Sequence, residues 1–459
     1  MEKSRMQIDH TNKEFLQAVD IVLNQHKSLF LTGRAGSGKT HFLKYITEQC
    51  KEQNRNVAVV APTGIAALNA GGQTIHSFFQ VPNSIFPPDD KRLRTKVPNS
   101  DSDKISIYNI FAYRETRKNI IKNTDLLIID EVSMLRCDLL DLIDCLLRVF
   151  RGKERGLENT PFGGVQVVLI GDPFQLPPVT TSADWDILGQ HYESPWFFSA
   201  KAFAIIFEFV ELEKIYRQTD KNYIELLNKM RDNSVEFNDL QLLNQRCHLN
   251  FKNSDKSKKY MNITTHNNAA EQVNERELQK LPTELHTFTG RVQGIFPQNN
   301  LPAPLYLSLK EGAQAMLVKN DSNRKYVNGS LGEITNIEDG KITIKLDNGL
   351  VFDLEKETWN NIEYVWNVSK KKIEENTIGR FIQFPLKLAW CITVHKSQGL
   401  TFDYVIADLS AAFATGQVYV ALSRCTSLEG LVLKTEIPPY AIKTDMQVLN
   451  FYERIKHRK

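Results

Sequence analysis

Cysteine is scarce in this chain, and long apolar runs are missing. Only six of the 459 residues are cysteine, and no two of them form a C-x-x-C pair. This spacing argues against a zinc site and a disulfide framework, so the thiols are predicted to be reduced core residues. No apolar run is long enough to cross a bilayer, and the charged segment from Met1 to Lys13 lacks the apolar core of a signal peptide. No membrane is therefore expected among the partners, and the predicted compartment is the cytoplasm.

A strong charge of one sign is also missing. Lys and Arg number 57 against 54 Asp and Glu, which leaves a net charge of +3. This balance gives no general affinity for polyanions, so a contact with one must come from a local groove. Apolar residues make up 42% and charged residues 24%, as in a folded protein, and the length predicts two to four structural units. The sequence shows no tandem repeats or long coiled-coil segments, which disfavours a scaffolding role.

The first 200 residues do contain short apolar runs separated by turns and helical segments. Runs of this kind, rich in leucine and β-branched residues, are typical of strands buried on both faces of a parallel sheet. They lie at Ser28–Leu31, Val57–Ala61, Leu126–Ile129 and Val165–Ile170. The predicted fold class is α/β, with ligands bound at the carboxyl ends of the strands.

The same patterns divide the chain. Parallel-sheet runs return at 261–264, 386–393 and 404–409, which predicts a second α/β lobe. Between them the apolar period changes to two, and Asp347-Asn-Gly separates two alternating runs as in a hairpin. We therefore predict a small antiparallel β-barrel at 286–385, inserted in a second lobe made of 201–285 and 386–459. The first lobe is predicted at 1–79 and 114–200, with a small polar insertion at 80–113.

The segment Gly33-Arg-Ala-Gly-Ser-Gly-Lys39-Thr40 satisfies G-x-x-x-x-G-K-[ST] between a predicted strand and a predicted helix. Glycines let backbone N–H groups surround phosphate oxygens, Lys39 places a charge on the terminal phosphates, and the Thr40 hydroxyl can hold Mg²⁺. The alternative is an ordinary glycine-rich turn, which the strand and helix context disfavours. ATP is therefore the predicted ligand, and the predicted binding residues include Gly33, Ala35, Gly36, Ser37, Gly38, Lys39 and Thr40.

Polar residues follow the next two strands as well. Asp130 and Glu131 end an apolar run, where one carboxylate can hold Mg²⁺ and the other can activate the attacking water as general base. Gln175 lies in Gly171-Asp-Pro-Phe-Gln, where an amide can contact both the γ-phosphate and the water. Either motif alone could be a solvated loop. Together with the phosphate loop they predict hydrolysis of ATP.

Two arginines, Arg217 and Arg424, are candidates for charges that reach the nucleotide from another lobe. Arginine fingers stabilise charge on a transferring phosphoryl group. From spacing alone neither is distinguishable from a surface arginine.

The ordered motifs resemble those of the petite-integration-frequency (Pif-one) helicases of superfamily one, from Thr32 to Gly430. The resembling segments are Ala61-Pro-Thr-Gly-Ile-Ala-Ala-Leu, Thr74-Ile-His-Ser-Phe, Asp130-Glu-Val-Ser-Met, Phe162-Gly-Gly-Val-Gln, Gly171-Asp-Pro-Phe-Gln-Leu-Pro-Pro, Ile392-Thr-Val-His-Lys-Ser-Gln-Gly-Leu-Thr-Phe-Asp and Val420-Ala-Leu-Ser-Arg-Cys. A set in this order is far more specific than any one member.

The resemblance implies two RecA-like lobes with ATP between them, movement 5′ to 3′ on single-stranded DNA, and unwinding of duplex, fork and G-quadruplex DNA. It assigns ATPase roles to Lys39, Thr40, Asp130, Glu131, Gln175, Arg217 and Arg424, and a strand-splitting wedge to 80–113. Family members often read adenine with a glutamine near the start, for which Gln17 is the nearest candidate. A compact bacterial or phage member, monomeric and associated with the nucleoid, is expected.

A motor that ignores base sequence should grip phosphates with hydroxyls, amides and a few cations, and stack bases on apolar faces. The candidates, which we call the strand-contact residues, are Thr63, Gly64, His76, Ser77 and Phe78 on the first lobe, and Thr265, His266, Asn267, His395, Lys396 and Ser397 on the second. His76 and His395 could equally be hydrogen-bonded structural histidines, and Phe78 could be a core residue. Metal binding by either histidine is disfavoured, since no second ligand stands at the right spacing.

Two other functions stay open from the sequence. An RNA helicase would use the same ATPase residues, because contacts to the 2′-OH decide between RNA and DNA. An ATP-gated clamp would hold single strands without travelling, but it would not need Glu131, Gln175 and both arginines together.

Overall fold

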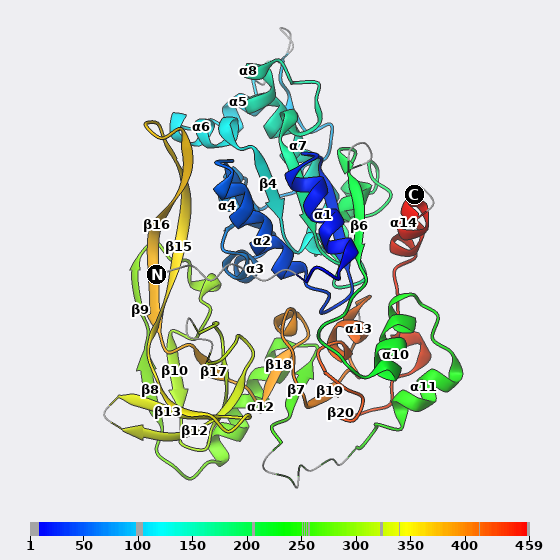
Figure 1. Cartoon of the computed structure of the whole chain (residues 1–459), viewed down its shortest axis with the longest axis vertical. Coiled ribbons are helices and arrows are strands. Elements are labelled where there is room, and N and C mark those ends of the chain that lie inside the picture. Colours follow the sequence, from blue (N-terminus) through cyan, green and yellow to red (C-terminus); the bar gives the residue numbers. More distant parts are fainter. Residues whose placement is uncertain are drawn as a thin grey trace.

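The computed structural model describes residues 9–97, 104–203, 207–249, 251, 253, 255, 258–321, 325–338, 340–412 and 414–456. Its two parallel sheets lie one above the other in Figure 1, and antiparallel strands flank them on one side. The predicted α/β class with two lobes is confirmed.

The first sheet has six parallel strands in the order β3-β2-β4-β5-β1-β6. These are β1 (Leu29–Gly33), β2 (Val57–Ala61), β3 (Gln73–Thr74), β4 (Leu126–Ile129), β5 (Gln166–Ile170) and β6 (Glu208–Leu212). The helices of this part are α1 (Lys13–Leu23), α2 (Lys39–Glu52), α3 (Gly64–Ala70), α4 (Ile75–Phe79), α5 (Ile107–Ile110), α6 (Glu115–Asn123), α7 (Cys137–Leu147), α8 (Lys153–Arg155) and α9 (Ser182–Leu188).

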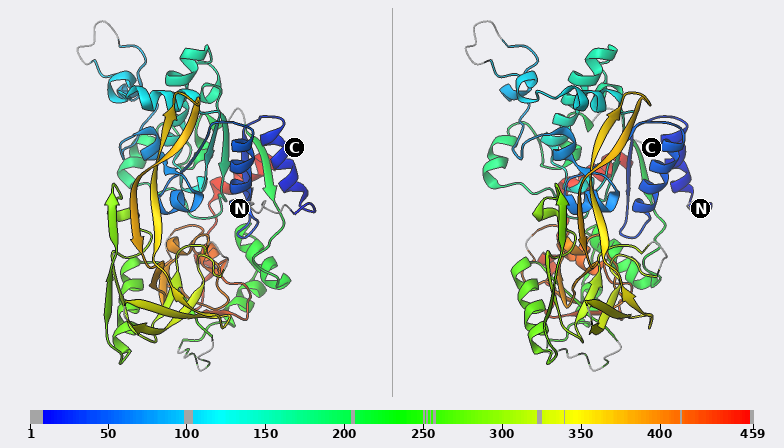
Figure 2. Two further views of the ribbon diagram at one scale, coloured as in Figure 1. Left: turned by 60° about the vertical axis from the view of Figure 1, so that its left-hand side comes forward. Right: turned by 90° about the vertical axis from the view of Figure 1, so that its left-hand side faces the viewer.

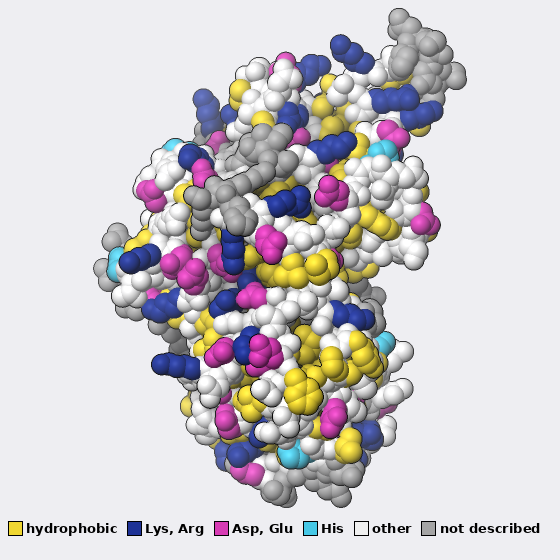
Figure 3. All heavy atoms as spheres, turned by 90° about the vertical axis from the view of Figure 1, so that its right-hand side faces the viewer, with side chains coloured by type: hydrophobic (Ala, Val, Ile, Leu, Met, Phe, Trp, Pro, Cys, Tyr) yellow, Lys and Arg dark blue, Asp and Glu magenta, His cyan; other side chains and the backbone are white. Residues whose placement is uncertain are grey.

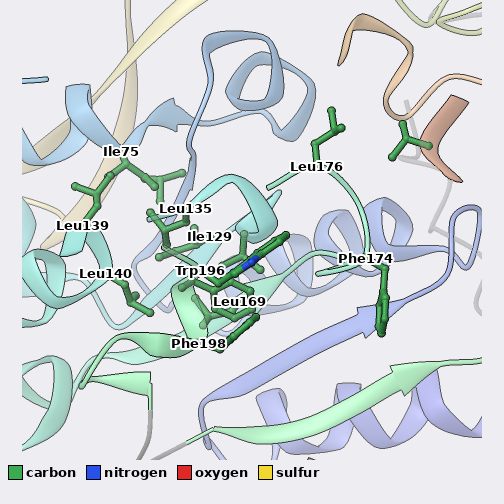
Figure 4. Packing of buried hydrophobic residues seen from close by; sticks show 14 of the residues in the cluster. Ile75, Ile129, Leu135, Leu139, Leu140, Leu169, Phe174, Leu176, Trp196 and Phe198 are labelled. Atoms are coloured by element: carbon green, nitrogen blue, oxygen red, sulfur yellow. The ribbon is translucent and has the colours of Figure 1, made fainter. Parts of the chain in front are cut away.

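Neighbouring residues of each central strand face opposite sides of this sheet, and both sides are buried. Leu29 and Leu31 pack with α1 and α2, whose Phe15 and Phe42 rings meet edge to face at 5.5 Å. The other face packs against α7, and Figure 4 shows Ile129 and Leu169 gathered with aromatic side chains. Two buried faces explain why these strands read as continuous apolar runs.

One predicted boundary is wrong. β6 lies in the range assigned to the second lobe, yet it pairs in parallel with β1, from Leu29 opposite Glu208 to Gly33 opposite Leu212. The first lobe therefore extends past residue 200. The β6 burial pattern of intermediate and buried residues is that of an edge strand, which explains why no continuous apolar run marked it.

The second sheet has four parallel strands in the order β18-β7-β19-β20. They are β7 (Met261–Thr264), β18 (Cys391–Thr393), β19 (Val405–Asp408) and β20 (Leu431–Leu433). The helices that follow β6 along the chain are α10 (Lys221–Arg231), α11 (Phe237–Asn244), α12 (Asn267–Lys280), α13 (Gln417–Leu422) and α14 (Met446–Lys456).

α14 does not stay with the second sheet. Its Phe451 ring stacks on Phe198 with 4.1 Å between centroids and also approaches Phe30 of β1. Just before the helix, the Asp445 carboxylate accepts a hydrogen bond of 2.8 Å from the Trp196 indole. The range 386–459, predicted as second lobe, therefore includes a helix that completes the core of the first.

The remaining strands form three antiparallel sheets. These are β8 (His286–Thr289) with β10 (Tyr306–Leu309); β14 (Val351–Leu354), β13 (Lys341–Leu346), β12 (Leu331–Glu338), β11 (Gln314–Leu317) and β17 (Leu386–Leu388); and β15 (Glu357–Asn367), β16 (Lys372–Gln383) and β9 (Arg291–Gly294). The predicted hairpin is confirmed, since Ile342 pairs with Leu354 and Lys345 with Val351. Closure of these strands into a barrel stays a prediction.

The β15–β16 hairpin reaches from the antiparallel strands to the first lobe, where Figures 1 and 2 show it beside α6. Arg117 of α6, 4% exposed, pairs with Glu363 at 2.6 Å. β3 has only two residues, so part of β2 has no neighbouring strand on that side of the sheet. Val59 N–H of β2 donates instead to the Tyr364 hydroxyl of the hairpin at 3.1 Å. The hairpin thus covers an edge of the first sheet.

The polar insertion at 80–113 packs on the first lobe through a few apolar residues. Phe86, Ile107 and Phe111 are buried, and the Asp138 carboxylate of α7 accepts from Phe86 N–H at 2.9 Å. Its segment 98–103 lies outside the described residues. The insertion as a wedge, and the remaining domain boundaries, stay predictions.

The composition has two structural counterparts. All six cysteines are free, and four of them are buried. Figure 3 shows basic and acidic side chains intermixed on the face that carries α10, α11 and α14, as a net charge of +3 suggests. Among the described residues, no helix combines the length and the apolar character needed to cross a bilayer.

Candidate nucleotide site and strand-contact residues

The phosphate loop connects β1 to α2, at the carboxyl edge of the first sheet. Gly36 and Gly38 have φ of +80° and +95°, in the left-handed region that favours glycine. A Cβ on Gly36 would also lie 2.4 Å from Cβ of Arg217, so only glycine lets that arginine approach the loop. The Ser37 hydroxyl is buried there without a hydrogen-bond partner, and is thus free to contact an anion.

Lys39 is the first residue of α2, and its ammonium lies over the loop. It donates to the carbonyl oxygens of Gly33 at 2.6 Å and Arg34 at 3.1 Å. Burial lowers the pKa of Lys39, while the charges of Asp172 and Glu131 act in the opposite direction. The lysine therefore lies among the carboxylates that follow β4 and β5.

Asp130 and Glu131 follow β4 at the same edge. Burial, and next the charge of Glu131, raise the pKa of Asp130 to about 7, and burial also raises the pKa of Glu131. Glu131 has φ of +50°, a left-handed conformation that costs a non-glycine residue roughly 1–3 kcal/mol. Two carboxyl groups with raised pKa values beside a lysine are an arrangement that active sites often use.

Gln175 is 7% exposed, and its amide donates to the Asp172 carboxylate at 3.4 Å. Its backbone lies against the second lobe, because a Cβ on Gly416 would be 2.7 Å from the Gln175 carbonyl oxygen. Gly416 immediately precedes α13, so the Gln175 loop and α13 are in direct contact.

Arg424 follows α13, is 1% exposed, and donates hydrogen bonds to neutral groups. Its guanidinium donates to the carbonyl oxygens of Val420, Ser397 and Leu400 and to the Ser423 hydroxyl. Burial lowers the pKa of Arg424 to about 10, with Glu131 among the charges that oppose the shift. A cation of the second lobe thus acts on the predicted general base of the first.

Arg217 lies on the segment between β6 and α10, against the phosphate loop. It donates to the Ser423 carbonyl at 3.2 Å, and burial followed by the charge of Arg424 lowers its pKa well below the ordinary value. The structure therefore brings Lys39, Glu131, Arg217 and Arg424 together at the boundary between the lobes.

Two residues at this boundary were not predicted from the sequence to belong to the site. Tyr419 of α13 accepts a hydrogen bond of 3.4 Å from Ala35 N–H in the phosphate loop. Arg231 of α10, 2% exposed, pairs with Asp172 at 3.4 Å and with Glu211 at 3.1 Å. Burial alone would lower the pKa of Arg231, but Asp172 and other neighbours raise it well above its usual value. The sequence offered one signal for a buried Arg231: it stands one helical turn after Leu227, and so on the same face of α10 as that buried residue.

The assignment of adenine recognition to Gln17 stays a prediction. Gln17 is exposed on α1, whereas Asn12 at the start of that helix donates to the Tyr216 hydroxyl at 3.1 Å. Tyr216 N–H in turn donates to the Gly36 carbonyl at 2.9 Å. The N-terminal end of α1 therefore reaches the phosphate loop through Asn12 and Tyr216.

The first-lobe strand-contact residues differ in exposure. Thr63 caps α3, and Gly64 packs so closely on Asn300 that a Cβ would lie 2.2 Å from its amide oxygen. Ser77 is exposed and His76 half-buried, with a pKa lowered by burial and by Arg136. Phe78 is fully buried against Phe79 and Tyr364, so in this conformation it is a core residue and not a surface for a base.

The second-lobe strand-contact residues lie at the carboxyl ends of β7 and β18. His266, Asn267, His395 and Lys396 are exposed, although neighbouring atoms desolvate part of the His395 imidazole and lower its pKa. Thr265 is largely buried and shares a 2.7 Å hydrogen bond with His266. The Ser397 hydroxyl donates to the Val394 carbonyl and the residue is fully buried, so its side chain is not available to a strand here.

Comparisons with known proteins decide the family. The sequence signature described as PIF1-like helicase matches residues 7–247, and that of the UvrD-like helicase C-terminal domain matches 388–432. This chain belongs to the PIF1-like helicase family. The ATP-dependent DNA helicase Pif1 of Bdellovibrio bacteriovorus is 30% identical, over 96% of this chain and 92% of that protein. The ATP-dependent DNA helicase PIF1 of Xenopus laevis is 31% identical over 94% of this chain, which spans 62% of that relative's length.

Solved structures of this family agree with the fold. Pif1 from Bacteroides sp in complex with ADP-AlF4 is 38% identical, with 98% of each chain covered and a TM-score of 0.86. Bacteroides Pif1 bound to ssDNA is 39% identical at the same coverage, with a TM-score of 0.66. The fold of the whole chain is thus that of the PIF1-like helicases.

Proposed function

We propose that this protein is an ATP-dependent DNA helicase that moves 5′ to 3′ along single-stranded DNA and opens duplex and G-quadruplex DNA, as a monomer on a bacterial or phage chromosome. The observation that carries the proposal is the meeting of charges between the lobes. Arg424 of the second lobe acts on Glu131 of the first, and Tyr419 of the second lobe contacts the phosphate loop. The Bacteroides Pif1 structure bound to ssDNA supports the choice of polymer.

The site contains groups suited to each part of ATP hydrolysis. Lys39 and the loop N–H groups would bind the phosphates, Gln175 would orient water, and Glu131 would accept its proton. Arg217 and Arg424 would stabilise the charge that develops on the γ-phosphoryl group. Movement of the lobes on each turnover would then shift the strand between two sets of contacts.

Asp130 and Thr40 supply carboxylate and hydroxyl oxygens, which are the donors that Mg²⁺ prefers. When bound, Mg²⁺ would neutralise charge on the β- and γ-phosphates. The raised pKa of Asp130 fits a carboxyl group whose anionic form a bound cation would stabilise.

The steady-state ATPase rate tests the proposal. It is measured with Mg²⁺ alone, with oligo-dT and with oligo-U, for the wild type and for Glu131→Gln. Strong stimulation by oligo-dT, little by oligo-U and an inactive variant are expected, and strand displacement with 5′- and 3′-tailed duplexes then gives the direction. Equal stimulation by oligo-U would favour an RNA helicase, and hydrolysis that ignores both polymers would favour the ATP-gated clamp.

A further inference from the structure

A cavity of about 670 Å³ lies where the second sheet meets the antiparallel strands, apart from the nucleotide site. Its walls come from α12, β10, β17 and β18, whose labels lie close together in Figure 1. The volume falls within the range of sites that hold small organic ligands, about 300–1,000 Å³.

Two cations line this cavity without an acidic partner. Lys387 of β17 and Lys396 form no ion pair among the described residues, although Glu271 and Glu275 of α12 also line the cavity with exposed side chains. Burial, and then the charge of Lys396, lower the pKa of Lys387 to about 8. Two lysines close enough to repel each other favour an anion between them.

The rest of the wall is largely apolar. Leu307 and Ile392 are buried, whereas Tyr306 is 66% exposed and Leu285 53% exposed. An exposed aromatic ring beside aliphatic side chains is a surface on which a base can stack. The cavity therefore combines the two features that a nucleotide requires, a cationic site and an apolar face.

The cavity also adjoins the second-lobe strand-contact residues. Lys396 lines it and is itself one of them, and Thr393 at the end of β18 lines it too. α12, which forms one wall, begins at the strand-contact residue Asn267. A strand that crosses the carboxyl ends of β7 and β18 would thus arrive at the mouth of the cavity.

We propose that this cavity holds one nucleotide of the bound single strand, with its phosphate between Lys387 and Lys396 and its base against Tyr306. The proposal rests on the proposed function, since it names a contact for the strand on which that function depends. Lys387 was not among the strand-contact residues predicted from the sequence, because it lies in none of the motifs that suggested them.

The test is the salt dependence of oligo-dT binding, measured by fluorescence anisotropy of a dye-labelled strand. Lys387→Met keeps the length of the side chain and removes its charge, and Lys345→Met, exposed on β13 and away from the cavity, is the matched control. One lost phosphate contact should lower the slope of log K against log salt by about 0.7 and weaken binding about fivefold near 0.1 M salt. Lys387→Arg should restore most of the slope, and thermal unfolding checks that each variant is folded.

A second variant tests the base. Tyr306→Ala should weaken oligo-dT binding about fivefold or more and leave the salt slope unchanged, because stacking involves no counterion release. An unchanged slope in Lys387→Met together with unchanged affinity in Tyr306→Ala would overturn the proposal.

Free nucleotide is the other source of this chemistry, and a dTMP titration distinguishes it. Binding of dTMP that is lost in Lys387→Met while the oligo-dT slope is unchanged would assign the cavity to a free nucleotide and reject the strand. The oligo-dT-stimulated ATPase rate separates the two hypotheses: stimulation with an unchanged slope refutes only the cavity, whereas no stimulation refutes the proposed function.

Discussion

Two buried arginines of the second lobe lie at its boundary with the first lobe, and their surroundings differ. Arg231 pairs with Asp172 and Glu211, and its guanidinium lies 4.1 Å from the Phe174 ring centroid and 5.0 Å from that of Tyr452. Arg424, equally buried, donates hydrogen bonds to carbonyl oxygens and a hydroxyl. Their pKa values accordingly shift in opposite directions, upward for Arg231 and downward for Arg424.

The difference separates a structural contact from a functional one. A buried cation with acidic partners holds its surroundings together whether or not a ligand is present. A buried cation without them is an unfavourable arrangement on its own, and it becomes favourable when an anion arrives. Arg231 thus joins the lobes, whereas Arg424 is suited to meet a phosphate.

The largest effect is expected for Arg424→Ala. Loss of an arginine that stabilises the transferring phosphoryl group should lower kcat of the oligo-dT-stimulated ATPase about 1,000-fold. The control is Arg276→Ala, an exposed arginine of α12, which should leave kcat within about twofold. If Arg424→Ala lowers kcat by less than tenfold, the lack of an acidic partner does not identify Arg424 as a residue that acts in catalysis.

Arg231→Met should act on stability first. It leaves the buried Asp172 and the partly buried Glu211 without their cation, which should lower the free energy of unfolding by about 3–5 kcal/mol. Urea denaturation followed by circular dichroism measures this value. A loss under about 1 kcal/mol would show that the two arginines do not differ as described.

Lys387 extends the comparison to pH, because it too lacks an acidic partner. Its pKa lies near 8 in the folded chain against an ordinary 10.5, so folding disfavours the charged form. This penalty is fully present below pH 8 and disappears as pH rises toward 10.5. Between pH 7 and 10 the wild type should gain about 2 kcal/mol of stability relative to Lys387→Met, measured by urea denaturation at each pH. Parallel pH profiles of the two proteins would contradict it.

The smallest effect is expected for Lys27→Ala. Lys27 pairs with Glu208 of β6 at 2.7 Å, but both side chains are about half exposed. Exposed pairs contribute roughly 0–1 kcal/mol, so the unfolding midpoint in urea should scarcely change. A loss comparable with that of Arg231→Met would show that burial is not what separates strong ion pairs from weak ones in this fold.

The central strands, the phosphate loop and the β13–β14 hairpin could be predicted because their signals are local. Val57–Ala61 is apolar throughout and buried on both faces, and Asp347-Asn-Gly has the composition of a tight turn. β6 was missed because an edge strand has a weaker apolar pattern than a central strand. α14 was assigned to the wrong lobe because the apolar face of a helix does not reveal which surface it packs against.

The candidate site divides in the same way. Lys39, Asp130 and Glu131 stand in recognisable motifs at strand ends, and the structure brings Lys39 and Glu131 within range of each other's charges. Arg231 and Tyr419 act across the boundary between the lobes. Contacts between residues so far apart in the chain produce no recognisable local sequence pattern. Phe78 was a candidate for strand contact because it stands in a motif with exposed neighbours, but its own side chain faces the core, the alternative that its composition also allowed.

The return of α14 to the first lobe has a consequence for synthesis of the chain. Phe30 and Phe198 can be covered by Phe451 only after α14 has left the ribosome, roughly 230 residues later than β6. At translation rates of about 5–20 residues per second, this leaves an aromatic surface open for roughly 10–50 s. The first lobe therefore lacks part of its aromatic core until α14 has been synthesised.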